Sequence, residues 1–199
     1  MDDMLEQDMR QARSDHCMTD ILSKTDVICL AFHHLKEIRG RTKLQKILYF
    51  ASLYADDIIN DYRFYQYGPY SEWVRQELDT LVHNDIVREK NERYSEGQAV
   101  YSYELTDNGR SLTKFILNEK IDSDIGKQIK TIFDEFIKFS KEELEIMSSL
   151  VFLKRINPGI SDNDLVDLVK QYKPWFSKDD INKNLVIFSL LKRMDINIF

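Results

Sequence analysis

The sequence predicts a mainly α-helical fold with one small β-hairpin and a bundle of helices at the C-terminal end. Amphipathic stripes, in which apolar residues are spaced by three and four, recur along the chain. Near the middle, two runs of β-branched and aromatic residues flank a polar tip that contains glycine, and this predicts a hairpin. Of the 199 residues, 43% are hydrophobic, which is enough to form the core of one domain or of two small ones.

The first elements are predicted to be an arm followed by two helices. Residues 1–19 are polar and acidic and are expected to be a flexible arm. From Asp20 to Leu35 the apolar residues share one side, which predicts a helix, and Gly40 ends that segment. The stretch RTKLQKILYFASLYA then forms one continuous apolar stripe, so we predict a second helix with Thr42 as its N-cap.

The stretch DDIINDYRFYQYGPYS is predicted to contain an extended segment and a tight turn. YRFYQ has the composition of a strand, and we expect it to pair with the hairpin further along the chain. Gly68-Pro69 is expected to form the turn, because proline fixes its own φ and restricts the residue before it. Ser71 then caps the helix SEWVRQELDTLV and aims it outward.

A hairpin and a further helix complete a predicted N-terminal domain of residues 20–118. IVREKNERYSEGQAVYSYELT supplies both strands and the tip, and a helix follows from about Gly109 to Leu117. Three helices, a hairpin and a helix are the order of a winged helix-turn-helix domain. In such domains the helix before the hairpin enters the DNA major groove and the hairpin is the wing. The fold class predicted here is therefore winged helix-turn-helix-like.

Residues 119–199 are predicted to form a C-terminal helical domain. Ser140 starts an S-K-E-E capping box, Asn157-Pro158-Gly159 breaks that helix, and Ser161 and Ser177 open the next two. The apolar stripes are broad for so short a segment. We therefore expect part of this surface to be covered by a second copy, which would make a homodimer, or by a partner protein.

Charge and cysteine content limit the class of protein. The net charge of −6 and the pI of about 5.3 argue against broad non-specific nucleic-acid binding, so any DNA site must be a local basic patch. No apolar run is long enough to span a membrane, and MDDMLEQDMR lacks the apolar core of a signal peptide. Cys17 and Cys29 show no metal-ligand spacing and are expected to be free thiols in a reducing cytoplasm.

A basic patch is predicted on the winged-helix surface. Arg75 could pair with guanine and Gln76 with adenine, both from the first turns of the outward helix that Ser71 opens. The cations of the wing and of the approach to the second helix suit phosphate contacts. The predicted DNA-binding residues are Arg39, Arg41, Lys43, Lys46, Ser71, Arg75, Gln76, Arg88, Lys90 and Arg93.

The same surface also supports a different function. Glu72, Glu77 and Asp79 lie on the outward face of the helix and would repel DNA, and three glutamates interrupt the cations of the wing. A winged helix of this kind could instead dock a partner protein. The function predicted from the sequence is a non-enzymatic DNA-binding transcriptional regulator, and the alternative is a protein-interaction module that does not bind DNA.

The sequence contains only weak candidates for metal-binding, base-stacking or catalytic residues. His33 and His34 are adjacent and point about 100° apart on a helix, so they cannot easily share a metal ion. A tyrosine cluster around Tyr65 and Tyr67 could stack on bases but suits a packed strand better. We find no nucleophile with a paired base, no paired carboxylates and no phosphate-binding glycine loop, so we expect neither an enzyme nor a cofactor.

Three stretches together resemble a known family. GRTKLQKILYFA, YGPYS and the hairpin end YELTDNG are similar to the YwgA-like family and, more distantly, to the Panacea (SocA-like) domain of antitoxins and phage-associated proteins. The resemblance covers about residues 20–115. It implies a winged-helix-like fold and, by analogy, a regulatory or antitoxin-like role in a toxin–antitoxin, phage or defence system. It supplies no catalytic residue.

Overall fold

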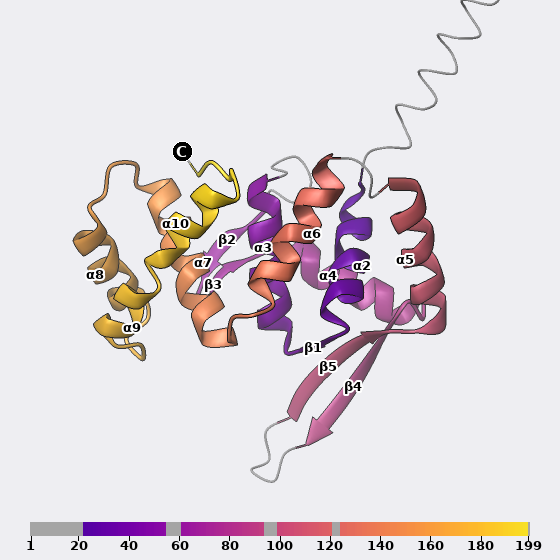
Figure 1. Cartoon of the computed structure of the whole chain (residues 1–199). Helices are drawn as coiled ribbons and strands as arrows, with labels where there is room; N and C mark the ends of the chain where they lie inside the picture. Colours follow the sequence, from indigo (N-terminus) through magenta and orange to yellow (C-terminus); the bar gives the residue numbers. More distant parts are fainter. Residues whose placement is uncertain (1–21, 55–60, 94–98, 121–123, 199) are drawn as a thin grey trace, which may run out of the picture.

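The computed structural model describes residues 22–54, 61–93, 99–120 and 124–198, and Figure 1 shows the arrangement of its helices and strands. The fold is mainly helical, with two small sheets. Its elements are α2 (Lys24–Leu35), β1 (Glu37–Arg39), α3 (Arg41–Tyr54), β2 (Arg63–Tyr65), β3 (Gly68–Tyr70), α4 (Glu72–His83), β4 (Val87–Arg93), β5 (Ala99–Leu105), α5 (Asp107–Lys120), α6 (Asp124–Phe136), α7 (Lys141–Ile156), α8 (Asp162–Tyr172), α9 (Lys178–Lys183) and α10 (Val186–Arg193).

Local capping explains where several helices begin. Ser71, Ser140, Ser161 and Ser177 each accept a hydrogen bond from a backbone N–H in the first turn that follows, as predicted. Ser23 forms a capping box with Asp26, so α2 begins at Lys24. The predicted start at Asp20 and the predicted arm of residues 1–19 lie outside the described residues.

The predicted hairpin is present and belongs to a three-stranded sheet. Strands β4 and β5 are antiparallel, and β5 also pairs with β1, which the sequence did not predict. In that pairing the buried Ile38 lies opposite the buried Tyr103. The β4–β5 hairpin extends away from the helices (Figure 1).

The YRFYQ stretch forms a strand, but the predicted partner was wrong. β2 pairs with β3, with Arg63 opposite Tyr70 and Tyr65 opposite Gly68. The turn therefore lies at Gln66 and Tyr67, while Gly68 and Pro69 belong to a strand. A two-residue loop closes at a small entropy cost, so local pairing is favoured over pairing with the distant hairpin.

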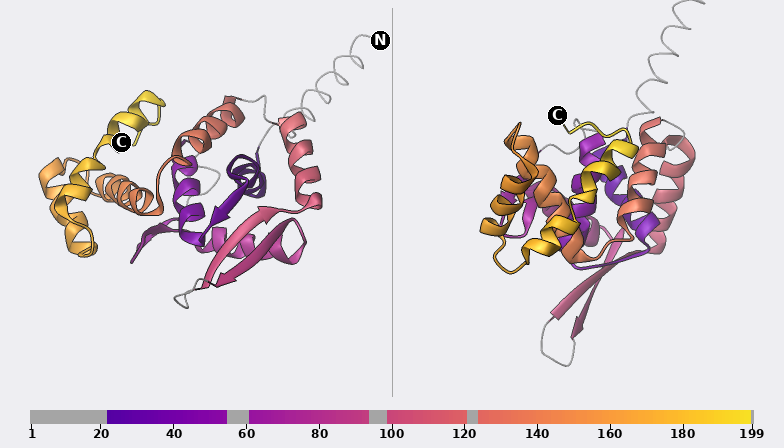
Figure 2. Two further views of the ribbon diagram at one scale, coloured as in Figure 1. Left: turned by 60° about the horizontal axis from the view of Figure 1, so that its bottom comes forward. Right: turned by 60° about the vertical axis from the view of Figure 1, so that its left-hand side comes forward.

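Of the C-terminal helices, α6 and α7 pack directly on α3. The rings of Phe50 in α3 and Phe136 in α6 are stacked at 3.9 Å. One hydrophobic core therefore runs across the proposed boundary at residues 118 and 119. Much of the apolar surface that led us to expect a homodimer is covered within the chain. In Figure 2, α8, α9 and α10 lie at one end and α5 at the other.

The last predicted helix is divided in two. Helix α9 ends at Lys183, and α10 begins at Val186. Asn184 separates them, and its side-chain amide donates to the Asp180 carbonyl over 2.8 Å. Within the described ranges, none of the helices has the length and apolar character that a membrane span requires.

Candidate functional site

The two stretches KLQK and YGPYS, far apart in sequence, meet in space. The Gln45 side chain donates to the Ser71 carbonyl over 2.9 Å and accepts from the Ser71 N–H over 3.0 Å. The Lys46 ammonium donates to the Pro69 carbonyl over 2.6 Å. Both side chains are buried, so α3 satisfies backbone groups of strand β3 with buried polar atoms.

A second buried lysine supports the same hairpin from the C-terminal half. The Lys173 ammonium, at the end of α8, donates to the Gln66 carbonyl over 2.8 Å and to a Glu145 carboxylate oxygen over 2.9 Å. Lys173 is fully buried, and the Glu145 side chain is 4% exposed. The β2–β3 hairpin is thus fixed by Lys46 on one side and by Lys173 on the other. We call Lys46, Glu145 and Lys173 the buried charge cluster.

Burial changes the ionisation of this cluster. The pKa of Lys46 falls from 10.5 to about 7, mainly because burial disfavours the charged ammonium and also because of the nearby charge of Lys173. Glu145 opposes this decrease. Burial likewise lowers the pKa of Lys173, against the hydrogen bond and charge of Glu145. Glu145 is therefore in contact with Lys173 and acts on Lys46 only through its charge.

A pocket lies between the start of α3 and the β2–β3 hairpin. Its volume is about 270 Å³, and we call it the hairpin pocket. Its lining residues are Arg41, Thr42, Gln45, Lys46, Tyr65, Gln66, Tyr67, Gly68 and Tyr70.

Exposed aromatic side chains surround the hairpin pocket. Tyr65 and Tyr67 are 55% and 51% exposed. The Tyr65 ring makes an edge contact with Tyr70 at 5.5 Å, and Tyr67 lies 6.3 Å from the exposed Trp175. We call Tyr65, Tyr67, Tyr70 and Trp175 the aromatic rim. Large exposed aromatic residues grouped in this way are typical of protein-binding surfaces.

The helix expected to face outward does so in part. In α4, Val74, Leu78 and Leu81 are buried, whereas Glu72 and Gln76 are exposed. The hairpin of β4 and β5 follows it, as predicted. DNA was predicted to bind to the exposed face of α4 and to the hairpin of β4 and β5, and this stays a prediction.

Two predicted DNA-binding residues are not on that surface. The Lys46 side chain is 1% exposed and Ser71 is fully buried. Ser71 caps α4, and its hydroxyl donates to Asp61 over 2.6 Å. Both residues hold the fold together and neither can reach DNA in this structure. The apolar stripe suggested that the polar residues of this helix face solvent, but α3 is buried on nearly all sides.

The arginines of the predicted surface are neutralised by acids. Arg41 lies 3.0 Å from Glu89 and 3.1 Å from Asp79, and it also donates to the Tyr103 hydroxyl over 2.7 Å. Arg75 is held between Glu72 at 2.5 Å and Asp79 at 3.0 Å.

The remaining predicted residues are also paired or lie elsewhere. Arg88 and Lys90 both pair with Glu104, at 3.4 and 2.9 Å, and the Lys90 bond holds the pKa of Glu104 below its usual value. The Gln76 amide donates to Glu72 over 3.3 Å. Arg39 pairs with Glu37, and Lys43 donates to the Ile137 carbonyl over 3.4 Å. The Arg93 side chain lies outside the described part of the chain.

The minor candidates from the sequence have structural roles. The pKa of His34 is lowered by burial, and its ring lies 3.7 Å from Asp134. Cys29 is buried, and its pKa is raised to about 12 by that burial, so it stays a thiol at neutral pH. Among the described residues, no three His, Cys, Asp or Glu side chains are grouped to hold a metal ion.

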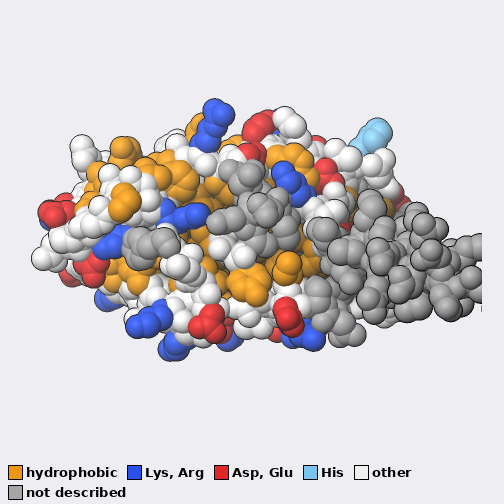
Figure 3. All heavy atoms as spheres, turned by 90° about the horizontal axis from the view of Figure 1, so that it is seen from above, with side chains coloured by type: hydrophobic (Ala, Val, Ile, Leu, Met, Phe, Trp, Pro, Cys, Tyr) orange, Lys and Arg blue, Asp and Glu red, His pale blue; other side chains and the backbone are white. Residues whose placement is uncertain are grey.

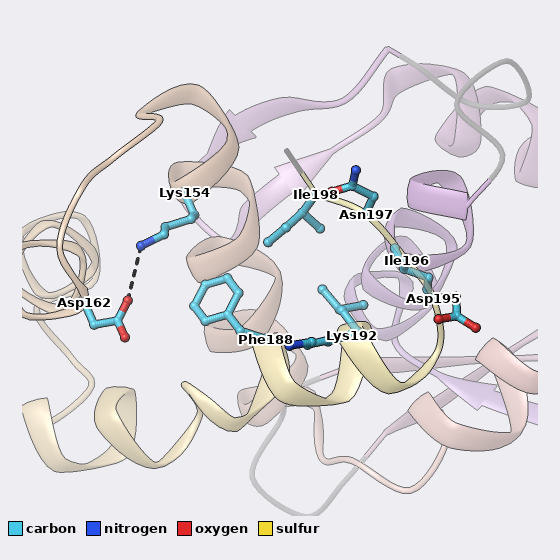
Figure 4. A pocket seen from close by; sticks show the side chains of 9 residues that line it. Lys154, Asp162, Phe188, Lys192, Asp195, Ile196, Asn197 and Ile198 are labelled. Atoms are coloured by element: carbon cyan, nitrogen blue, oxygen red, sulfur yellow. Dashed lines mark hydrogen bonds and ion pairs between the residues drawn. The ribbon is translucent and has the colours of Figure 1, made fainter.

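A larger hollow of about 550 Å³ lies where the C-terminal segment crosses α7 and α10 (Figure 4). Phe188 and Ile198 line it, and Lys154 bridges to Asp162 over 3.2 Å at its edge. Figure 3 shows the molecule from above, where hydrophobic side chains gather with lysines and arginines among them. Lys154 is one of two lysines that line this hollow, and it is already paired with Asp162.

Sequence reasoning named Arg41, Lys46, Tyr65 and Tyr67 but did not place them in one pocket, and it missed Gln45. Gln45 and Lys46 are polar positions inside an otherwise apolar helix, and that signal could have marked them as buried and bonded. The sequence around Lys173 and Glu145 did not mark them as buried, because only the fold brings these two residues to the β2–β3 hairpin. The pocket lies where the KLQK and YGPYS stretches join.

Comparison with known proteins identifies a relative that covers most of the chain. No family model matches the chain. The uncharacterized protein YwgA of Bacillus subtilis (strain 168) is 30% identical over 160 residues, which are 79% of this chain and 90% of that protein. The chain therefore belongs to the YwgA-like family.

Proposed function

We propose that this chain is a non-enzymatic protein-interaction module on a winged-helix-like scaffold, and that it binds a partner protein through the hairpin pocket and the aromatic rim. The observation that carries this proposal is the exposure of Tyr65 and Tyr67 beside a pocket. Tyrosine, tryptophan and arginine dominate the energetics of protein interfaces, and an anchor side chain in a pocket is their usual centre.

The charge pairing on the α4 face favours this function over DNA binding. A phosphate that approached Arg41 or Arg75 would have to compete with carboxylates already in contact. The carboxylates would remain nearby and repel the DNA backbone, so the gain from releasing counterions would be small. The overall charge of −6 acts in the same direction.

The test is partner capture with a matched control. The tagged chain is compared with the double variant Tyr65→Ala, Tyr67→Ala and with Phe115→Ala, whose exposed ring lies on α5. All three substitutions remove exposed rings, so thermal unfolding should stay nearly unchanged. A partner that binds the wild type and the Phe115 variant, but not the tyrosine variant, and that does so again when both proteins are purified, supports the proposal. Equal binding to all three proteins contradicts it.

A DNA-binding transcriptional regulator is the second candidate. The outward α4 followed by the β4–β5 hairpin favours it, because this is the order of a winged helix-turn-helix. A shift of random duplex at low salt, weakened for all sequences by Arg41→Glu and Lys43→Glu, would support it. If the purified chain does not shift duplex at low salt, this candidate is removed.

The distant resemblance to the Panacea domain suggests where the partner could be found. By that analogy, a toxin, nuclease or phage protein encoded nearby is the first partner to test. The homodimer and the cytoplasmic location stay predictions. Light scattering after size exclusion measures the oligomeric state directly.

A further inference from the structure

The buried charge cluster has more positive than negative charge. Lys46 and Lys173 are both buried, and Glu145 is the carboxylate in contact with Lys173. Among the described residues, no carboxylate lies within ion-pair distance of Lys46, and the Pro69 carbonyl is its one hydrogen-bond acceptor. An ammonium has three donors, so Lys46 keeps capacity for further acceptors. A buried cation without a counter-charge is costly, and the protein can either release the proton or gain a carboxylate.

The hairpin pocket lies against Lys46, of which 1% is exposed. Lys46 lines that pocket together with Arg41. Within the described part of the chain, the bonds of Arg41 use Nε and Nη2, so the Nη1 donors remain for another oxygen. First-turn residues of α3 also line the pocket, and that turn contains no acidic side chain. The positive end of the helix dipole is therefore not neutralised within its own first turn.

The size of the pocket fits one side chain of a partner. Ligand pockets usually measure about 300–1,000 Å³, and this one is close to 270 Å³. It suits a single anchor group better than a large cofactor. The exposed rings of Tyr65 and Tyr67 offer apolar surface next to it for a neighbouring residue.

We propose that the hairpin pocket binds a carboxylate, carried by an aspartate or glutamate side chain of a partner protein, with Lys46 and Arg41 as its receptors and the aromatic rim holding an adjacent apolar residue. This inference rests on the proposed function and specifies what the partner presents. The partner segment is acidic and apolar, and its carboxylate completes the buried charge cluster.

Protonation of Lys46 makes this binding sensitive to pH. The charged and titratable groups around Lys46 are Lys173 from α8, Glu145 from α7, Arg41 from α3, and Tyr62, Tyr65, Tyr67 and Tyr70 near the hairpin. Only the ammonium form of Lys46 attracts a carboxylate, and its pKa in the free protein is about 7. Affinity should therefore fall by about tenfold per pH unit as the pH rises above about 7.

The experiment uses NMR of the full chain with probes of known charge. Sodium benzoate and neutral benzamide are titrated while the amide signals of Gly68 and Ser71 are followed, with Gly159 as a distant reference. Two acetylated peptide amides, Phe-Glu-Phe and Phe-Gln-Phe, form the second pair of probes. We expect benzoate to shift both pocket signals and benzamide to shift neither. The Glu peptide should bind more tightly than benzoate and at least tenfold more tightly than the Gln peptide.

Matched variants identify the receptor. Lys46→Met should abolish the benzoate shift, and Lys43→Met, three residues earlier on the same helix, should keep it. If Lys46→Met fails to fold, the pH profile of benzoate binding to the wild type replaces it, and a flat profile overturns the role of Lys46.

Different results would overturn the carboxylate site and the assignment of that carboxylate to a partner side chain. No benzoate shift, or equal binding of the two peptides, overturns the carboxylate site. Binding of benzoate without binding of the Glu peptide shows a site for a small acid and overturns the partner side chain. These results leave the capture experiment with Tyr65 and Tyr67 variants unaffected, so failure of this site and failure of the proposed function are distinguishable.

Discussion

Replacing Lys46 by methionine should change how the stability of the protein depends on pH. In the folded chain the pKa of Lys46 is about 7, whereas an unfolded lysine titrates near 10.5. Because the folded value is lowered, the unfolded state binds more protons between these pH values. The contribution of Lys46 to stability is therefore fully present above about pH 10.5 and is lost as the pH falls through 7.

The size of this effect follows from the two pKa values. Between about pH 6 and pH 9, linkage predicts that the wild type gains about 2.5 kcal/mol of unfolding free energy from Lys46. The methionine variant cannot gain it. The variant also loses the hydrogen bond to the Pro69 carbonyl, which costs about 1–3 kcal/mol at every pH.

Urea denaturation followed by circular dichroism measures the difference. We expect the free energy of unfolding of Lys46→Met, relative to wild type, to become less favourable by about 2.5 kcal/mol from pH 6 to pH 9. Lys43→Met is the control and should show a difference that does not depend on pH. A constant difference for Lys46→Met would refute the reasoning, because Lys46 would then titrate alike in both states.

Three further predictions concern buried groups. Glu145→Gln should destabilise the fold by about 3–5 kcal/mol, because it leaves Lys173 buried without its carboxylate; Glu142→Gln on the exposed side of α7 is the control. Gly68→Ala should cost about 1–3 kcal/mol more than Gly159→Ala. Both glycines have φ of +87°, but only at Gly68 would a Cβ lie 2.6 Å from a serine oxygen. Cys29 should also contribute a loss of unfolding free energy from about pH 9 to pH 12, because burial raises its pKa to about 12, and Cys29→Ala should remove that contribution.

Local signals in the sequence predicted the hairpin and the starts of α4, α7, α8 and α9, whereas Thr42, predicted as an N-cap, lies inside α3. A serine three residues before an acid satisfies backbone donors wherever the helix lies, so Ser140 could be recognised without any tertiary information. The alternating residues of β5 were equally clear. The three-residue strand β1 was missed because it exists only through pairing with a strand more than 60 residues away.

The site was harder to predict than the fold. The cations on the predicted DNA surface could be read from the sequence, but the pairing of Arg41 with Glu89 could not, because only the fold brings the β4–β5 hairpin close to α3. Lys46 was assigned to the surface although it is buried. A lysine in an apolar helix can extend to solvent or bond inside, and sequence alone does not distinguish the two.

The most direct test of the central claim compares two surfaces in one binding assay with a purified partner. The double variant Tyr65→Ala, Tyr67→Ala changes the aromatic rim, and Arg75→Ala, Gln76→Ala changes the exposed face of α4. We predict that the first loses at least tenfold in affinity and that the second binds like wild type. Loss of binding through Arg75 and Gln76, with the tyrosine variant unchanged, would contradict the claim that the partner docks at the hairpin pocket.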